Sequence, residues 1–203
     1  RGVGKSWITS AYVCHQLLLN PQLNILVVSA SKNRADDFST FTLRLINEID
    51  VLAHLKPRED QRQSKVSFDV KPARASHAPS VKSLGITGQL TGSRSDLVIA
   101  DDVESANNSA TMGMRDKLSE QVKEFESILK PQGRIIFLGT MQTEMSLYNV
   151  LPTRGYKQRI WTARYPNEKQ VKNFGDILAP LIRNTWSIDE QGKPTDPERF
   201  DDE

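Results

Sequence analysis

Cysteine and histidine are scarce in this sequence. Cys14 is its only cysteine, and its three histidines, His15, His54 and His77, are scattered along the chain. One thiol excludes an internal disulfide and a thiolate metal cluster, and no two histidines have a spacing that suits a shared metal ion. The sequence is therefore neither a disulfide-stabilised scaffold nor a cysteine-rich metal domain.

Long apolar runs are missing as well. No window approaches the roughly 18 to 20 consecutive apolar residues of a membrane span, and no segment resembles a signal peptide. With 203 residues, of which 37% are hydrophobic, the chain is long enough to bury one substantial core. We therefore expect a soluble α/β protein without a membrane partner.

The formal net charge of +2 is small but unevenly distributed. Residues 189–203 hold seven acidic and two basic side chains, whereas residues 56–94 hold eight lysines and arginines against three carboxylates. Such a basic segment either contacts a phosphate backbone or is a solvated loop. The candidates for DNA contact are Lys56, Arg58, Arg62, Lys65, Lys71 and Arg74.

Apolar residues recur at helical spacing in some segments and form continuous or alternating runs in others. Helices are predicted over residues 5–19, 31–50, 118–129 and 143–150, the third ending near Pro131. Strands are predicted over residues 24–31, 65–70, 80–87, 96–102, 134–140 and 157–163. Strands that alternate with helices and are apolar throughout indicate a mainly parallel sheet covered on both faces.

The chain opens on part of a phosphate-binding loop, "RGVGKSW". The loop of nucleotide hydrolases runs Gly, four residues, Gly-Lys-Ser/Thr, and Gly4, Lys5 and Ser6 match its end. Its first glycine would precede residue 1, so we interpret the chain as a piece of a longer polypeptide. Lys5 would contact the β and γ phosphates and the Ser6 hydroxyl would complete a Mg²⁺ shell. The alternative is an ordinary helix start.

A second motif, "LVIADDVE" at 97–104, places carboxylates at the end of an apolar strand. Ligands of open α/β sheets bind at that end of the strands. Asp101 suits the carboxylate that organises Mg²⁺ in a Walker B strand. Either Asp102 or Glu104 is the candidate acid that activates the attacking water, and the alternative is a strand-end turn capped by aspartates.

Two further positions are candidates for action on the γ-phosphate. Thr140 follows the strand run "IIFLG", where a hydroxyl could sense this phosphate and couple its loss to movement. Arg94 lies just before the Walker B run, and an arginine at the transferred phosphate supplies about 10³ to 10⁵ in rate. Arg94 otherwise solvates a loop or pairs with Asp96.

Six segments together resemble the large terminase subunit, or DNA maturase, of short-tailed double-stranded DNA bacteriophages. They are "RGVGKSWITSA", "LNILVVSASKNRADD", "PSVKSLGITGQLTGSRSDLVIADDVE", "NSATMGMRDKL", "IIFLGTMQTEMSLY" and "PTDPERFD". The resemblance implies a P-loop NTPase fold of the recombinase-like (ASCE) type, here without its N-terminal strand. It also implies an ATPase that uses ATP and Mg²⁺ to drive viral double-stranded DNA into a capsid.

The family's site residues carry over onto matching positions. The nucleotide-binding residues would be Arg1, Gly2, Val3, Gly4, Lys5, Ser6 and Trp7. Ser6 and Asp101 would hold the metal, and the catalytic set would be Lys5, Arg94, Asp101, Asp102, Glu104 and Thr140. Many terminases have Asp-Glu where this chain has Asp101-Asp102, so the catalytic acid stays open between Asp102 and Glu104.

The resemblance also implies an organisation and partners. Residues 1–184 would form the ATPase domain, and residues 185–203 a linker toward a nuclease domain that is absent here, so we expect no nuclease activity and poor ATP hydrolysis. The partners would be DNA, a portal protein, a small terminase subunit and further copies in a homo-oligomeric ring, with five as the expected number. The place of action would be the host cytoplasm. The alternatives are a helicase-like translocase and a nucleotide-binding scaffold that does not hydrolyse.

Overall fold

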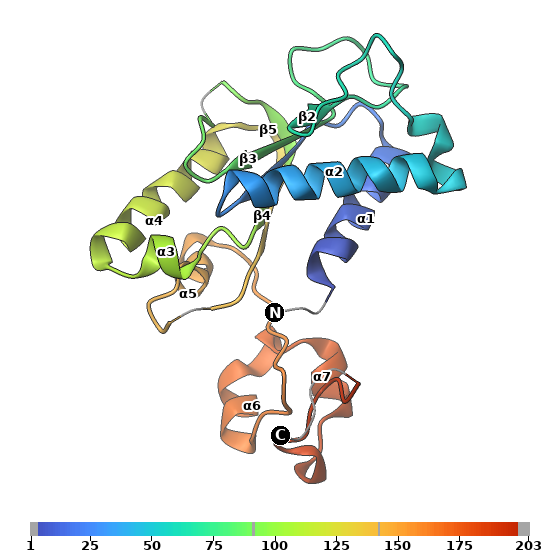
Figure 1. Ribbon diagram of the computed structural model, residues 1–203. Helices are drawn as coiled ribbons and strands as arrows, with labels where there is room; N and C mark the ends of the chain where they lie inside the picture. The colour runs from blue at the N-terminus through green and yellow to red at the C-terminus, as the bar shows by residue number, and fades with distance from the viewer. Residues whose placement is uncertain (1–3, 91, 142, 199–203) are drawn as a thin grey trace. The chain divides into compact units, whose positions relative to one another are not determined.

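The computed structural model describes residues 4–90, 92–141 and 143–198 (Figure 1). The predicted site residues Arg1, Gly2 and Val3 lie outside these ranges. The chain divides into two compact units, Arg1–Asn149 and Val150–Glu203. We describe each unit by itself. The expected division into an ATPase domain and a linker at residue 184 stays a prediction.

The first unit contains both helices and strands. Its helices are α1 (Lys5–Leu19), α2 (Lys32–Glu48), α3 (Ala106–Ser109) and α4 (Met112–Ser127), with a 3₁₀ turn η1 (Asp50–Leu55) and a short α5 (Leu147–Val150) at its end. Its strands are β1 (Ile25–Ser29), β2 (Ser67–Phe68), β3 (Val81–Gly85), β4 (Ser95–Asp101) and β5 (Leu129–Leu138).

The five strands form one sheet in the order β2-β3-β1-β4-β5. β2 pairs with β3 antiparallel, and every other pair is parallel. Ile25 of β1 is in register with Val81 of β3 and Leu97 of β4. The predicted α/β class with a mainly parallel sheet is therefore confirmed, and the carboxyl ends of β1, β3, β4 and β5 share one edge.

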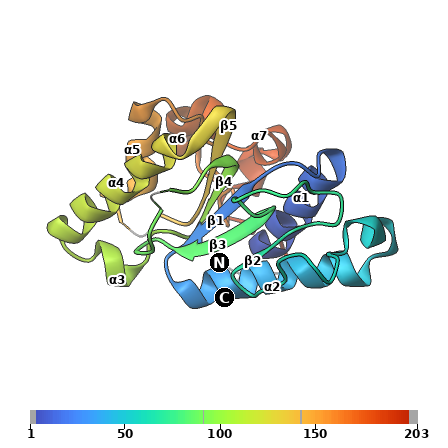
Figure 2. The same cartoon turned by 90° about the horizontal axis from the view of Figure 1, so that it is seen from above.

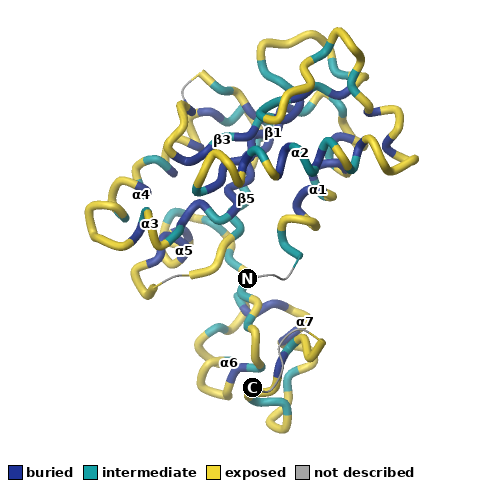
Figure 3. The backbone as a smooth tube through the Cα atoms, viewed as in Figure 1, coloured by how far each residue is buried: buried dark blue, intermediate teal, exposed yellow. Residues whose placement is uncertain are grey.

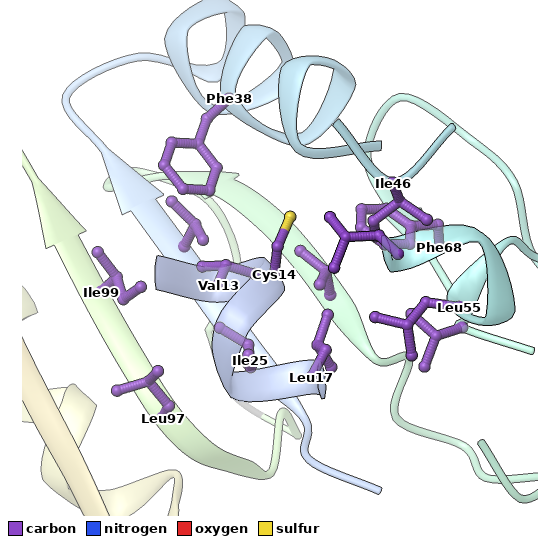
Figure 4. Packing of buried hydrophobic residues seen from close by; sticks show 14 residues of the cluster. Val13, Cys14, Leu17, Ile25, Phe38, Ile46, Leu55, Phe68, Leu97 and Ile99 are labelled. Carbon is purple, nitrogen blue, oxygen red and sulfur yellow. The ribbon is translucent and has the colours of Figure 1, made fainter. Parts of the chain in front are cut away.

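The main core lies between the sheet and the helices α1 and α2. Val13 and Leu17, four residues apart on α1, are fully buried, as helical spacing requires for one face. They pack with Phe38 of α2 and with Ile25 and other strand residues in one apolar cluster (Figure 4). Figure 3 shows the same burial as dark blue along the central strands.

α4 packs on the other face of the sheet. The Phe125 ring of α4 stacks on the Phe137 ring of β5, with the centroids 5.9 Å apart. Seen from above, α1 and α2 lie on one side of the strands and α4 on the other (Figure 2). The expectation that helices cover both faces is confirmed.

Several element boundaries differ from the prediction. The third helix ends at Ser127 rather than near Pro131, because Pro131 belongs to a bulge in β5. The register there passes from Ser95↔Leu129 to Leu97↔Arg134, so residues 130–133 are looped out of the pairing. The predicted helix over 143–150 contracts to α5, and the predicted strand over 65–70 to the two residues of β2.

The second unit consists of short helices and turns. They are η2 (Leu151–Arg154), α6 (Glu168–Phe174), η3 (Gly175–Ile177), α7 (Pro180–Thr185) and η4 (Ile188–Glu190). The strand predicted over 157–163 is wrong: its only ladder contact among the described residues is an isolated bridge between Ile160 and Leu178, and Trp161 is 66% exposed. An apolar run without a neighbouring strand to complete a ladder does not become a strand.

The second unit has its own small core. Leu178, Ala179 and Ile182 are buried against Tyr165 and other half-buried residues. The segment predicted as a linker takes part in this unit, since the Thr195 amide donates to the Ala163 carbonyl at 2.9 Å. Within the described ranges of both units, no helix combines the length and apolarity that crossing a bilayer demands.

Candidate nucleotide site

Lys5 and two aspartates meet at the carboxyl edge of the sheet. Lys5 Nζ lies 2.5 Å from Asp102 Oδ1 and 3.5 Å from Asp101 Oδ1. The lysine begins α1 and the aspartates end and follow β4, so the sheet joins residues 97 positions apart. The two motifs that the sequence analysis treated separately therefore form one cluster.

The start of α1 offers free backbone donors to an anion. Gly4 precedes the helix with a φ of +67°, a left-handed conformation that favours glycine, and no side chain caps this end. The first amides of a helix have no partner within it, and the helix dipole places partial positive charge there. This end of α1 therefore suits a phosphate group.

Asp101 is suited to share a cation. It is 8% exposed at the end of the buried strand β4. Burial raises the pKa of this carboxyl, while Lys5 and a hydrogen bond from Ser6 oppose the rise. Its buried Oδ1 accepts no hydrogen bond from any described residue. A carboxylate oxygen that accepts no hydrogen bond, beside a hydroxyl, matches the oxygen ligands that Mg²⁺ prefers, so Ser6 and Asp101 fit a magnesium ion.

Asp102 turns the chain sharply at the strand end. Its φ of +48° is rare for a residue with a side chain and costs on the order of 1 kcal/mol or more. The Asp102 amide donates to the Leu138 carbonyl of β5 at 2.8 Å, which fixes the turn. As a result, the Asp102 carboxylate, one-third exposed, points to Lys5.

Glu104 has a different environment. Its side chain is buried, and its Oε2 accepts hydrogen bonds from the Ser146 hydroxyl at 2.7 Å and from the Leu147 amide at 2.8 Å. Glu104 thus ties the loop after β4 to the first residue of α5. The structure separates the two candidate acids: Asp102 contacts Lys5, and Glu104 is engaged elsewhere.

The segment after β5 is packed against this loop. A Cβ added to Gly139 would overlap the ring of Tyr148. The Tyr148 hydroxyl donates to the Leu138 carbonyl at 3.4 Å, and burial raises its pKa. The contacts of Tyr148 and Glu104 escaped the sequence analysis, because they join residues from separate segments of the chain. Thr140, exposed, lies two residues beyond Leu138, which is in register with Asp101.

The structure does not bring Arg94 to this cluster. Arg94 precedes the first residue of β4, whereas Asp101 is its last. Seven residues at about 3.3 Å each place the two about 23 Å apart. Trp7, also predicted to bind nucleotide, is 65% exposed and meets Phe41 of α2 edge to face, with the centroids 4.4 Å apart.

The six residues predicted for DNA contact fall into two groups: two arginines that make contacts within their own loop, and four residues that are exposed. Arg58 pairs with Asp60 and donates to the Lys71 carbonyl, and Arg62 pairs with Asp69 and donates to the His77 carbonyl. These arginines hold the loop of residues 58–77 together. The other members, Lys56, Lys65, Lys71 and Arg74, are exposed.

The fold and the site define an α/β protein with a candidate ligand site at the carboxyl edge of a mostly parallel sheet. In an alignment of 208 positions that covers 99% of the chain, the sequence is 53% identical to the large terminase subunit of Enterobacteria phage T3. The chain spans 36% of the length of that protein. The resemblance to a phage large terminase subunit that its motifs indicate is therefore confirmed over nearly the whole chain. No protein-family model matches the chain.

Proposed function

We propose that this chain is the ATP-hydrolysing motor region of a DNA-packaging terminase, with a P-loop NTPase fold of the recombinase-like type. The observation that carries the proposal is the convergence of Lys5 with Asp101 and Asp102 at the start of α1. The identity to a large terminase subunit supports packaging as the setting. The proposed place of action is the host cytoplasm, at a portal, in a ring of copies together with a small terminase subunit.

In this proposal, Lys5 and the first amides of α1 bind the β and γ phosphates. Lys5 now pairs with Asp102, and the triphosphate would take over part of that pairing. Gly4, Ser6 and Trp7 complete the described part of the nucleotide contact. A bound Mg²⁺ would neutralise charge on the phosphates, and Ser6 and Asp101 would hold it.

Asp102 is the better candidate for orienting the attacking water. Its carboxylate is one-third exposed and lies beside Lys5, where the γ-phosphate would bind. Glu104 already accepts two hydrogen bonds and is 4% exposed, so water reaches it poorly. We therefore assign Glu104 to holding the segment that carries Thr140, which follows β5 at the same edge of the sheet.

Arg94 acts on a nucleotide only if that nucleotide belongs to another subunit. The length of β4 separates it from Lys5 within one chain. In the ring that we propose, Arg94 of one subunit is the candidate, among the described residues, for contacting the nucleotide phosphates bound by the neighbouring subunit.

Binding of a fluorescent ATP analogue with Mg²⁺ tests the proposal, because binding is measured independently of turnover. Lys5→Ala should lower the affinity at least tenfold. Lys117→Ala, on the exposed surface of α4, removes the same charge away from the site and should change nothing. Equal affinities of wild type and Lys5→Ala would refute the nucleotide site.

Two alternative functions remain to be distinguished from the packaging motor. A helicase-like translocase would hydrolyse ATP with the same residues, and a nucleotide-binding scaffold would bind ATP without hydrolysing it. Single-turnover hydrolysis in a ring assembled on DNA separates the scaffold from the others, because a scaffold releases no phosphate. Strand separation of a forked duplex separates the helicase from the packaging motor.

A further inference from the structure

A cavity lies at the amino edge of the sheet, the edge opposite to the candidate nucleotide site. Its volume is about 290 Å³. The lining comes from the beginnings of the parallel strands and from the loops before them, and it includes Asn24, His77, Lys82, Arg94 and Lys130. We name this cavity the amino-edge cavity.

Positive charge dominates the amino-edge cavity. Lys82, Arg94 and Lys130 line it, and none of the lining residues is a carboxylate. Lys82 Nζ donates to the Ser93 hydroxyl, at 3.2 Å. Throughout the described ranges, no carboxylate lies within ion-pair distance of Lys82, and Arg94 has no hydrogen-bond or ion-pair partner. Two cations therefore face one cavity without an opposing charge.

A hydrogen-bond network fixes the wall of the cavity. Lys130 Nζ contacts Asn24 Oδ1 at 2.5 Å and Asp96 Oδ2 at 2.9 Å, and Asp96 also accepts from the Asn24 amide at 2.8 Å. The Asn24 side chain donates to the Pro79 carbonyl at 2.8 Å, which holds the loop that contains His77. Hydrogen bonds thus hold this wall of the cavity in place, and the charge of Lys130 is paired with Asp96.

A second cavity continues the basic surface. It has a volume of about 280 Å³, shares Asn24 and Lys130 with the first, and adds Arg74. Its one carboxylate, Asp69, is paired with Arg62. The positive charge thus extends beyond a single cavity, to Arg74.

We propose that the amino-edge cavity binds phosphate groups of the DNA backbone. Phosphate groups repeat along a DNA strand. One phosphate therefore enters the cavity between Lys82 and Arg94, while another phosphate of the same strand meets Arg74. No residue of the lining belongs to a helix, so the amide cluster that favours a compact triphosphate is missing among the described lining residues. This inference rests on the proposed function in one respect, that the chain acts on DNA.

The test is the affinity of the nucleotide-free chain for a fluorescein-labelled DNA duplex, measured by anisotropy over a range of salt concentrations. Lys82→Gln/Arg94→Gln should weaken binding at low salt about tenfold or more. The double substitution should also make the plot of the logarithm of the association constant against the logarithm of the salt concentration less steep, by about 0.9 for each phosphate that the variant no longer neutralises. Lys82→Arg keeps the charge and should keep the affinity.

The matched control is Lys56→Gln/Lys65→Gln, which removes two exposed charges from the same basic segment outside both cavities. It should weaken binding much less than the cavity variant. Three outcomes would overturn the proposal: a larger loss of affinity in the control than in the cavity variant, equal losses in the two variants, or no DNA binding by the wild type. Binding of the ATP analogue to Lys82→Gln reports on the nucleotide site alone, so absence of the DNA effect with nucleotide binding intact refutes this inference and leaves the ATPase proposal standing.

Discussion

Glu104 Oε2 accepts a hydrogen bond from the Leu147 amide at 2.8 Å, across 43 residues of sequence. The same oxygen accepts from the Ser146 hydroxyl, and the side chain is buried. This one carboxylate therefore connects the loops that follow β4 and β5, the two strands that end beside the candidate nucleotide site.

Glu104→Ala should destabilise the first unit. The change leaves a buried hydroxyl and a buried amide without an acceptor, at a cost of about 3 kcal/mol in the free energy of unfolding. Urea denaturation followed by circular dichroism measures it. Glu124→Ala, on the exposed surface of α4, should cost less than about 0.5 kcal/mol. Similar costs for the two variants would show that the Glu104 hydrogen bonds contribute nothing.

Gly139→Ala should be destabilising by about 1 to 3 kcal/mol, because the new methyl group overlaps the Tyr148 ring. Adding Tyr148→Ala should make the Gly139 substitution nearly neutral, which a double-mutant cycle measures. Gly113→Ala in α4 meets nothing within 4 Å and should be neutral or stabilising. Additive effects at positions 139 and 148 would contradict the packing.

Asp101→Asn should stabilise the folded chain at pH 7. Burial raises the pKa of Asp101 when the chain folds, so the charged carboxylate costs stability above that pKa. The cost is relieved as the pH falls from the raised pKa toward the ordinary value. The difference in unfolding free energy between variant and wild type should therefore shrink on acidification, and a difference that grows would contradict the shift.

The same substitution separates stability from ligand binding. Asp101→Asn should lose the Mg²⁺ dependence of nucleotide binding while it gains stability, because a neutral amide is a weak ligand for this ion. Titration of the ATP analogue with and without Mg²⁺ measures the difference. A variant that keeps the full Mg²⁺ effect would exclude Asp101 as a ligand.

Asp102→Asn should raise the affinity for the triphosphate in the absence of Mg²⁺. The wild-type Asp102 carboxylate forms an ion pair with Lys5 at 2.5 Å and repels an incoming anion. Asparagine still tolerates the left-handed backbone conformation of this turn. We expect a gain of up to about tenfold from the removal of this repulsion. Asp116→Asn, exposed on α4, is the control. Weaker binding of Asp102→Asn would mean that the carboxylate positions Lys5 rather than competing for it.

Local pattern was sufficient for the parts of the fold that depend on near neighbours. The helical spacing of apolar residues predicted α1, and the apolar run to Asp101 predicted β4 and the carboxylates at its end. The Ser31 cap of α2 was also predictable, since its hydroxyl accepts from the Arg34 amide three residues away. These features require no knowledge of the rest of the chain.

Other features depend on contacts between distant residues. Pro131 stops a helix in local terms, yet pairing of β5 with β4 absorbs it in a bulge. The run at 157–163 has strand composition but lacks a neighbouring strand among the described residues. Glu104 was a plausible general base until Ser146 and Leu147 were placed beside it, 42 and 43 residues away. The amino-edge cavity likewise gathers lysines from β3 and β5, which no sequence window contains together.

β4 has neighbours on both sides and is hydrogen-bonded along its length, to β1 and to β5. Six residue steps of about 3.3 Å each make it about 20 Å long, so it spans the sheet from one edge to the other. Asp101 stands at one end and Arg94 adjoins the other. β4 is thus a continuous hydrogen-bonded connection between the carboxyl edge of the sheet, where Lys5 meets Asp101, and the amino edge, where the basic cavity lies.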